Sequence, residues 1–246
     1  LPAELGHSAA GLCEPMAVCV RGARIGGIEL GDRVAIIGAG TIGPDIGYYL
    51  KSAMPDCKLI LVDVVEKPLQ KAEQRLKAYA EKAVTKKKMK EDRAAAVLEN
   101  ITYTTDYAAI KDCELVIEAA TEDIPLKQKI FASVEEIVSP GAIVTSNTSS
   151  IPADRLFSRM KHPERTTVTH FFAPAWRSLP VEIIDWDGGS QETLDYLFWF
   201  FAKTGKAPII TANAICFILD RVFDNWCNEA AYLLSHATAS QVDKVA

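Results

Sequence analysis

The segment VAIIGAGTIG, residues 34–43, constrains the fold of this chain more than any other. Gly38, Gly40 and Gly43 follow a strand-like apolar run and precede a helical pattern. Glycine at this spacing permits a tight turn and lets a pyrophosphate approach the backbone at a helix N-terminus, where the helix dipole favours anions. The segment therefore predicts a dinucleotide-binding strand, loop and helix, with the loop residues Thr41 and Ile42 also in the site.

A second strand-like run, LILVD at 59–63, ends in an acidic residue. Asp63 follows Gly43 by about 20 residues, the separation at which an acid accepts hydrogen bonds from the adenosine ribose hydroxyls. Such an acid favours NAD over NADP as the cofactor. The plainer alternative is a glycine-rich turn followed by a helix-capping Asp, but the strand before the loop and the helix after it favour the nucleotide site.

Apolar runs of strand length alternate with longer helical patterns along most of the chain. Near-continuous apolar strands between helices indicate a parallel sheet covered on both faces. We therefore predict an α/β fold: a doubly wound (Rossmann), mostly parallel sheet, followed by a partial all-helical domain. Strands are expected at 33–38, 58–63, 114–119, 142–147, 166–172, 181–184 and 207–210, and helices at 44–53, 66–98, 125–138, 152–160 and 190–204.

Three regions follow from this pattern. Residues 1–30 are expected to form an N-terminal helical extension, 31–212 the NAD-binding Rossmann domain, and 213–246 a C-terminal helical domain of the dimerisation type. Apolar residues in the last region recur at three- and four-residue spacing, which is typical of amphipathic helices. The final helical pattern has no Gly or Pro to end it, so we expect this domain to be incomplete in the chain.

Charge and composition narrow the possible partners. The net charge of −5 argues against nucleic acid as a partner. No apolar run reaches the roughly 18–20 residues that span a bilayer, so we expect no membrane segment. The six cysteines contain no CxxC pair, which is typical of reduced thiols in a cytoplasmic protein.

Taken together and in order, several segments resemble the L-3-hydroxyacyl-CoA dehydrogenase family over about residues 32–246. They are DRVAIIGAGTIG, LILVDVVE, TTD, LVIEAATED, SNTSS, HFFAP, LPVEII and GKAPII. The resemblance implies an NAD-binding Rossmann domain and a helical domain that forms a homodimer. It also implies a role in fatty acid metabolism: oxidation of the 3-hydroxyl of an acyl-CoA to a ketone, with hydride passed to NAD⁺.

The same resemblance assigns roles to individual residues. His170 of HFFAP matches the general base, and Glu182 matches the carboxylate that orients it. Histidine suits this role because its ordinary pKa lies near neutrality, and a carboxylate on the far ring nitrogen stabilises the imidazolium. From the residues alone, a core histidine beside a chance acid is an equal alternative. Ser149 matches a residue that contacts the substrate and the nicotinamide, and Asn147, Glu122 and Lys127 match residues that contact the cofactor. Lys86 matches a residue near the CoA phosphates, although the lysine run around it also fits a solvated helix end.

The chain departs from the family pattern in two places that bear on catalysis. Ala173 replaces a cofactor-side Asn, and Asp220 stands where a catalytic-site Asn is expected. An ionised Asp can only accept hydrogen bonds, and its charge favours protonated His170, which is not a base. Arg177 is a candidate partner for Asp220 or for a substrate carboxylate, or simply a surface residue. These changes leave two alternatives open: a catalytically impaired nucleotide-binding homologue, or a dehydrogenase of a different hydroxy acid.

Residues 1–40 also resemble the linker segment of zinc-type medium-chain alcohol dehydrogenases. In some of those enzymes the Glu that corresponds to Glu14 helps to bind zinc. Glu14 and His7 cannot form a site that normally takes three or four protein ligands, so we predict no metal site. Stoichiometric bound zinc would revive the alcohol dehydrogenase alternative.

Overall fold

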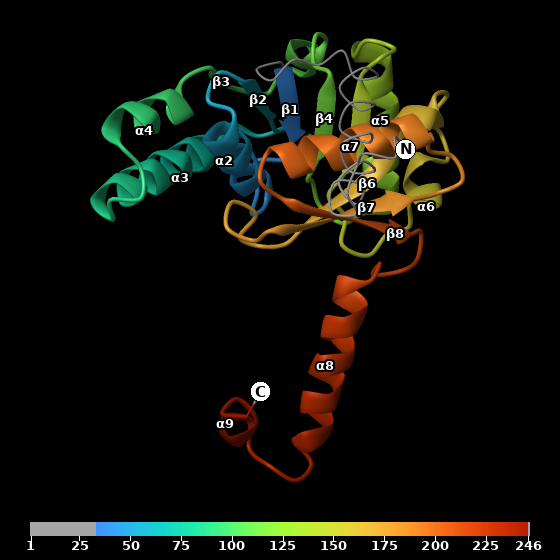
Figure 1. Cartoon of the computed structure of the whole chain (residues 1–246). Helices are drawn as coiled ribbons and strands as arrows, with labels where there is room; N and C mark the ends of the chain where they lie inside the picture. Colours follow the sequence, from blue (N-terminus) through green and yellow to red (C-terminus); the bar gives the residue numbers. More distant parts are fainter. Residues whose placement is uncertain (1–32, 246) are drawn as a thin grey trace, which may run out of the picture.

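The computed structural model describes residues 33–245 of the 246-residue chain. An eight-stranded sheet with strand order β3-β2-β1-β4-β5-β6-β7-β8 forms its centre (Figure 1). The strands are β1 (Arg33–Ile37), β2 (Lys58–Val62), β3 (Ile101–Thr104), β4 (Leu115–Glu118), β5 (Ile143–Ser146), β6 (Thr166–Phe171), β7 (Pro180–Asp185) and β8 (Ala207–Ala212). Neighbouring strands from β3 to β6 pair in parallel, β7 pairs antiparallel with β6, and β8 pairs parallel with β7. The predicted doubly wound, mostly parallel sheet is confirmed.

Helices cover both faces of the sheet because alternate strand residues point to opposite sides. In β1, Val34 and Ile36 join one apolar cluster, whereas Ala35 and Ile37 join the other. The first cluster includes residues from α2 (Gly43–Ala53), α3 (Glu66–Thr85) and α7 (Gln191–Lys203), and the second includes residues from α5 (Ile124–Ile137) and α6 (Ala153–Phe157). Two short 3₁₀ turns, η1 (Tyr107–Ile110) and η2 (Pro163–Arg165), lie in the connections.

Three sequence predictions about local elements were wrong. The single helix expected at 66–98 is two helices, α3 and α4 (Glu91–Leu98), with Lys87 between them at a φ of 55°. A positive φ interrupts a right-handed helix, and α4 folds back on α3 through a small apolar cluster of its own. The edge strand β3 was not predicted, since its residues are only half-buried. The helix expected at 152–160 extends only over Ala153–Phe157.

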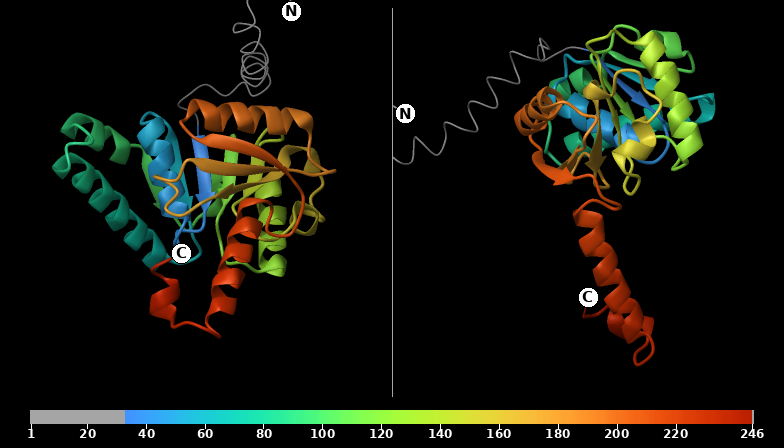
Figure 2. Two further views of the ribbon diagram at one scale, coloured as in Figure 1. Left: turned by 60° about the horizontal axis from the view of Figure 1, so that its bottom comes forward. Right: turned by 90° about the vertical axis from the view of Figure 1, so that its right-hand side faces the viewer.

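The last strand of the sheet ends at Ala212, and helices follow it in the described chain. Helix α8 (Leu219–Leu233) projects away from the sheet and α9 (Ala239–Val242) lies near its far end, as Figures 1 and 2 show. No residue of α8 is buried. The body of the molecule thus has its own core, whereas α8 has none. The extension predicted at 1–30 lies outside the described residues.

Candidate active site

The glycine loop connects β1 to α2, and two of its glycines cannot carry a side chain. A Cβ on Gly38, whose φ is 108°, would lie 2.5 Å from the Ala119 carbonyl oxygen. A Cβ on Gly43 would lie 1.9 Å from the Gly38 carbonyl oxygen. By contrast, a Cβ on Gly40 would meet nothing within 4 Å, so this face of the loop is open. Gly38 and Gly43 therefore shape the turn, and Gly40 leaves room for a phosphate at the start of α2.

Asp63 follows β2 and lies beside the glycine loop. Its Oδ2 accepts a hydrogen bond from the Ala39 amide at 2.8 Å, and its Oδ1 accepts one from the Val65 amide at 3.2 Å. Gly38, Gly40, Asp63 and Tyr107 help to line a cavity of about 200 Å³ here. An acid held at the end of the second strand, next to this cavity, fits the ribose of a dinucleotide. This half of the site would hold the adenosine of NAD.

A second cavity, of about 380 Å³, contains His170. Its lining comes from residues far apart in the sequence: Ile42, Ala119, Ala120, Glu122, Asn147, Ser149, His170, Phe171, Phe172, Ala173 and Asp220. Ala119 and Ala120 also line the Asp63 cavity, so the two cavities share one wall just beyond β4. A dinucleotide that crosses this wall would bring its nicotinamide end to His170.

His170 and Glu182 form a buried hydrogen-bonded pair. They are directly opposite each other in the antiparallel register of β6 and β7, which places both side chains on one face of the sheet. His170 Nδ1 lies 2.8 Å from Glu182 Oε2. The other carboxylate oxygen accepts hydrogen bonds from the amides of Ile218 and Leu219, at 3.0 and 2.9 Å. Glu182 thus holds both the imidazole and the first turn of α8.

These contacts also determine the charge of Glu182. Burial raises the pKa of Glu182, but hydrogen bonds from His170 and from the Leu219 and Ile218 amides outweigh it, so the pKa is lowered. Glu182 therefore stays ionised at neutral pH. A fixed anion on Nδ1 leaves the other ring nitrogen of His170 available to take a proton.

Asp220 lies on the first turn of α8, with its Oδ2 3.8 Å from His170 Nε2. Burial raises the pKa of Asp220, His170 lowers it, and the nearby charges of Glu182 and Asp224 raise it; the net shift is upward. Asp220 lines the His170 cavity on the side of Nε2.

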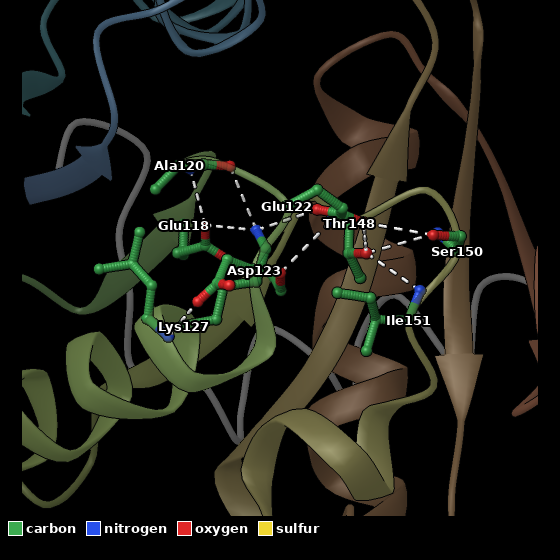
Figure 3. Close-up of polar contacts among 10 residues, drawn as sticks. Glu118, Ala120, Glu122, Asp123, Lys127, Thr148, Ser150 and Ile151 are labelled. Atoms are coloured by element: carbon green, nitrogen blue, oxygen red, sulfur yellow. Dashed lines mark hydrogen bonds and ion pairs between the residues drawn. The ribbon is translucent and has the colours of Figure 1, made fainter.

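Of the other residues predicted for the site, some line the His170 cavity and Lys127 does not. Asn147 and Ser149 line the His170 cavity, and Asn147 also accepts a hydrogen bond from the Phe171 amide at 2.9 Å. Glu122 lines the cavity as well. Lys127 does not: its side chain is 1% exposed and its ammonium group contacts Glu118 and Glu122 (Figure 3). Burial at the N-terminal part of α5 keeps Lys127 behind the cavity wall.

Three further predicted residues line neither cavity. Lys86 is exposed at the end of α3, and its predicted role with CoA phosphates stays a prediction. Arg177 is exposed on the β6–β7 connection and has no ion pair with Asp220 in the described part of the chain; its predicted role with a substrate carboxylate stays a prediction. Thr41 is exposed on the glycine loop, and its carbonyl oxygen accepts a hydrogen bond from Arg75 at 2.7 Å.

Sequence reasoning missed two residues of the site. Glu118 is fully buried behind the shared wall, and Phe217 packs its ring 5.9 Å from the His170 ring. Glu118 stands inside a quoted motif, but an acid at the end of a strand gives no sign of its partner nine residues later. Phe217 lies near α8 in sequence and is buried against the sheet only through the tertiary fold.

Within residues 33–245, no helix is long and apolar enough to cross a bilayer. The same part of the chain contains no group of three or more His, Cys, Asp or Glu side chains placed to hold a metal ion. His7 and Glu14, which prompted the zinc alternative, lie outside it.

Comparison with known proteins agrees with this geometry. The sequence model of a family described as "3-hydroxyacyl-CoA dehydrogenase, NAD binding domain" matches residues 33–214. The fatty acid oxidation complex subunit alpha of Colwellia psychrerythraea is 32% identical over 215 residues, which is 87% of this chain and 30% of that protein. The 3-hydroxybutyryl-CoA dehydrogenase of Escherichia coli K12 has a TM-score of 0.79 at 30% identity, over 85% of this chain and 43% of its own.

The (S)-3-hydroxybutyryl-CoA dehydrogenase of Ralstonia eutropha has a TM-score of 0.78 at 31% identity, over 82% of this chain and 71% of its own. The chain thus spans less than half of the Colwellia and E. coli proteins but most of the Ralstonia protein. The family match covers the strands, the glycine loop, His170 and Glu182 together. On these grounds the chain belongs to the 3-hydroxyacyl-CoA dehydrogenase family and carries its NAD binding domain.

Proposed function

We propose that the chain catalyses NAD-dependent oxidation of the 3-hydroxyl of a 3-hydroxyacyl-CoA, or a related acyl thioester, to the 3-oxo compound. The observation that carries this proposal is the His170–Glu182 pair, with its 2.8 Å hydrogen bond, in the wall of a cavity next to the glycine loop. His170 takes the hydroxyl proton through Nε2, while Glu182 stabilises the imidazolium that forms. NAD⁺, when bound, supplies the acceptor for the hydride that leaves carbon 3.

The residues of the two cavities have separate tasks in this reaction. The open face of Gly40 and the start of α2 bind the pyrophosphate, and Asp63 binds the adenosine ribose. Ser149 positions the substrate hydroxyl near His170, since both line one cavity. The carboxylates of Glu122 and Asp220 give this cavity a negative potential, which suits the positively charged nicotinamide ring of NAD⁺.

The acyl-CoA part of the proposal rests on the named relatives, two of which are 3-hydroxybutyryl-CoA dehydrogenases. Phe172, whose ring lies 4.4 Å from the His170 ring, gives the cavity an apolar side that suits a short acyl chain. A hydroxy acid without the thioester would find no arginine or lysine in the cavity lining to bind its carboxylate. This lining therefore favours an uncharged thioester over a free acid.

Reduction of acetoacetyl-CoA by NADH, followed through NADH absorbance, tests the proposal. We expect turnover by the native chain and a loss of about 10³-fold in kcat for His170→Ala. The control is His162→Ala, which removes an exposed histidine that also contacts a glutamate. NADH binding without turnover of any acyl-CoA would contradict the substrate assignment, and equal rates for the two histidine variants would contradict the base.

A catalytically impaired nucleotide-binding homologue is the second candidate. One observation favours it: Asp220 places a carboxyl group 3.8 Å from the nitrogen that must act as the base. In that case NADH binds, but neither 3-hydroxyacyl-CoA nor free hydroxy acids are oxidised. Recovery of turnover in Asp220→Asn would identify Asp220 as the cause.

We also propose that the chain forms a homodimer through its helical region. Val222, Phe223 and Trp226 of α8 are 63%, 56% and 51% exposed, and a second copy would cover them. Analytical ultracentrifugation should give a dimer for the native chain and a monomer for Phe223→Asp/Trp226→Asp. A native monomer at micromolar concentration would contradict the proposal.

A further inference from the structure

A buried ion pair lies directly behind the wall that the two cavities share. Glu118, the last residue of β4, is 0% exposed, and Lys127 of α5 is 1% exposed. Lys127 Nζ lies 2.6 Å from Glu118 Oε1, and the Ser146 hydroxyl donates to Glu118 Oε2 at 2.6 Å. Each charge therefore has a partner, as buried charges require. Neither residue lines either of the two cavities.

Glu118 and Lys127 form hydrogen bonds with the two backbone polar groups of Ala120, its amide and its carbonyl. The strand ladder of β4 ends with the Ala119 amide, which donates to the Ile37 carbonyl at 2.7 Å. Beyond it, the Ala120 amide donates to Glu118 Oε1 at 2.6 Å, and its carbonyl accepts from Lys127 Nζ at 3.3 Å. Backbone groups that leave a strand need new partners, and one ion pair supplies both here. Ala120 is one of the two residues, with Ala119, that line both cavities.

The same lysine also positions a side chain of the His170 cavity. Lys127 Nζ lies 3.3 Å from Glu122 Oε2. The other Glu122 oxygen accepts hydrogen bonds from the Thr148 and Ser150 hydroxyls, the latter at 3.5 Å. Figure 3 shows the lysine nitrogen between Glu118, Ala120 and Glu122. Glu122, 41% exposed, thus stands in the cavity at the end of a chain of contacts that begins at buried Glu118.

We infer that Glu118 is a positioning residue for the nicotinamide end of the cofactor. Together with Lys127 it fixes the Ala120 backbone and the Glu122 carboxylate, which line the His170 cavity. A buried ion pair adds little net stability compared with apolar residues of the same volume, so stability alone gives no reason for one at this point. The adenosine end relies on different contacts, because Asp63 is held by the Ala39 and Val65 amides. This inference rests on the proposed use of NAD.

Binding at the two ends of the cofactor can be measured separately with two ligands, because NADH contains the nicotinamide and ADP-ribose lacks it. The main variant is Glu118→Gln/Lys127→Met, which removes both charges at once and avoids leaving one charge buried alone. Calorimetric titration should show NADH affinity reduced about tenfold, the size of one charged hydrogen bond, with ADP-ribose affinity changed less than about twofold. Ser146→Ala, which removes only one partner of Glu118, should weaken NADH binding in the same direction but less.

Glu135→Gln/Arg165→Met is the matched control, because Glu135 and Arg165 form another largely buried pair that lines neither cavity. This control should bind NADH and ADP-ribose with native affinity, even if its Tm falls by as much as that of Glu118→Gln/Lys127→Met. Equal losses for NADH and ADP-ribose, or no loss for either, in both Glu118-network variants would overturn the inference. Failure of the native chain to bind NADH would overturn the proposed function with it. NADH binding without turnover would instead overturn only the catalytic proposal.

Discussion

The glycine loop and the His170 cavity lie at the same edge of the sheet, but different interactions shape them. Six consecutive residues, 38–43, form the loop, and backbone contacts such as that between Gly43 and Gly38 determine its shape. Side chains from four connections, one strand and the first turn of α8 form the cavity. The loop is therefore a local structure, whereas the cavity exists only while several elements, α8 included, keep their places.

Glu182 shows how closely the cavity depends on α8. One of its oxygens holds His170 and the other holds the Ile218 and Leu219 amides. No residue of α8 is buried, so its position against the sheet depends on the few contacts of its first turn. Changes at this junction should affect the chemistry, and changes in the glycine loop should affect cofactor binding and folding.

Glu182→Gln should have the largest effect and would sharpen this contrast. The amide group would donate to His170 Nδ1 and so place the ring proton on Nε2, where the imidazole can no longer accept one. We expect kcat for acetoacetyl-CoA to fall by about 10²-fold or more, with NADH affinity nearly unchanged. Glu164→Gln, at the exposed His162–Glu164 pair, is the control and should leave kcat unchanged. An unchanged rate for Glu182→Gln would remove the dyad from the mechanism.

Gly43→Ala tests the structural role of the glycine loop, and we expect it to affect folding stability. The new Cβ would overlap the Gly38 carbonyl oxygen, so we expect a loss of about 2 kcal/mol in the free energy of unfolding, or roughly 4–8 °C in Tm. Gly40→Ala is the matched variant, since its Cβ meets no protein atom. It should keep the native Tm but weaken NADH binding in calorimetric titration. Similar Tm values for both variants would contradict the structural role of Gly43.

Asp220→Asn tests whether α8 limits the base. Asp220 Oδ2 lies 3.8 Å from His170 Nε2, and burial raises the pKa of Asp220, so its negative charge appears as the pH rises through that shifted value. We expect the Asn variant to raise kcat/KM roughly threefold near neutral pH, because an amide group can donate a hydrogen bond to a substrate oxygen whereas an ionised carboxylate can only accept one. A lower rate would indicate that Asp220 is matched to a different substrate.

Lys206→Met should have the smallest effect and concerns the sheet edge next to the cavity. Lys206 donates to the Ser178 carbonyl at 2.5 Å and lies 4.3 Å from the Tyr49 ring centre, and burial lowers its pKa to about 8. Between about pH 8 and the ordinary lysine pKa of about 10.4, the unfolded chain binds the proton more strongly, so the free energy of unfolding rises with pH. Urea midpoints at pH 7.5 and 10 should rise less in Lys206→Met than in the native chain. The same change of the urea midpoint with pH in the native chain and in Lys206→Met would contradict the lowered pKa of Lys206.

Much of the fold follows from the sequence because its signals are local. The glycine spacing, the acid after LILVD and the near-continuous apolar strands predicted the doubly wound sheet, since each depends on residues adjacent in the chain. The break between α3 and α4 was missed because the lysines at 82–90, together with Ala83 and Met89, are good helix formers, and the packing of α4 on α3 outweighs that preference.

The sequence by itself determined the nucleotide-binding fold and, through the order of its motifs, the identity of His170 and Glu182 as candidates. Only the tertiary structure decided that Lys127 is turned inward to Glu118, that Arg177 lies apart from Asp220, and that one carboxylate links the base to α8. The physical reason is the distance along the chain over which each interaction acts. Backbone turns and strand patterns depend on neighbours in sequence, whereas buried charged side chains pair with residues that only the tertiary fold brings close.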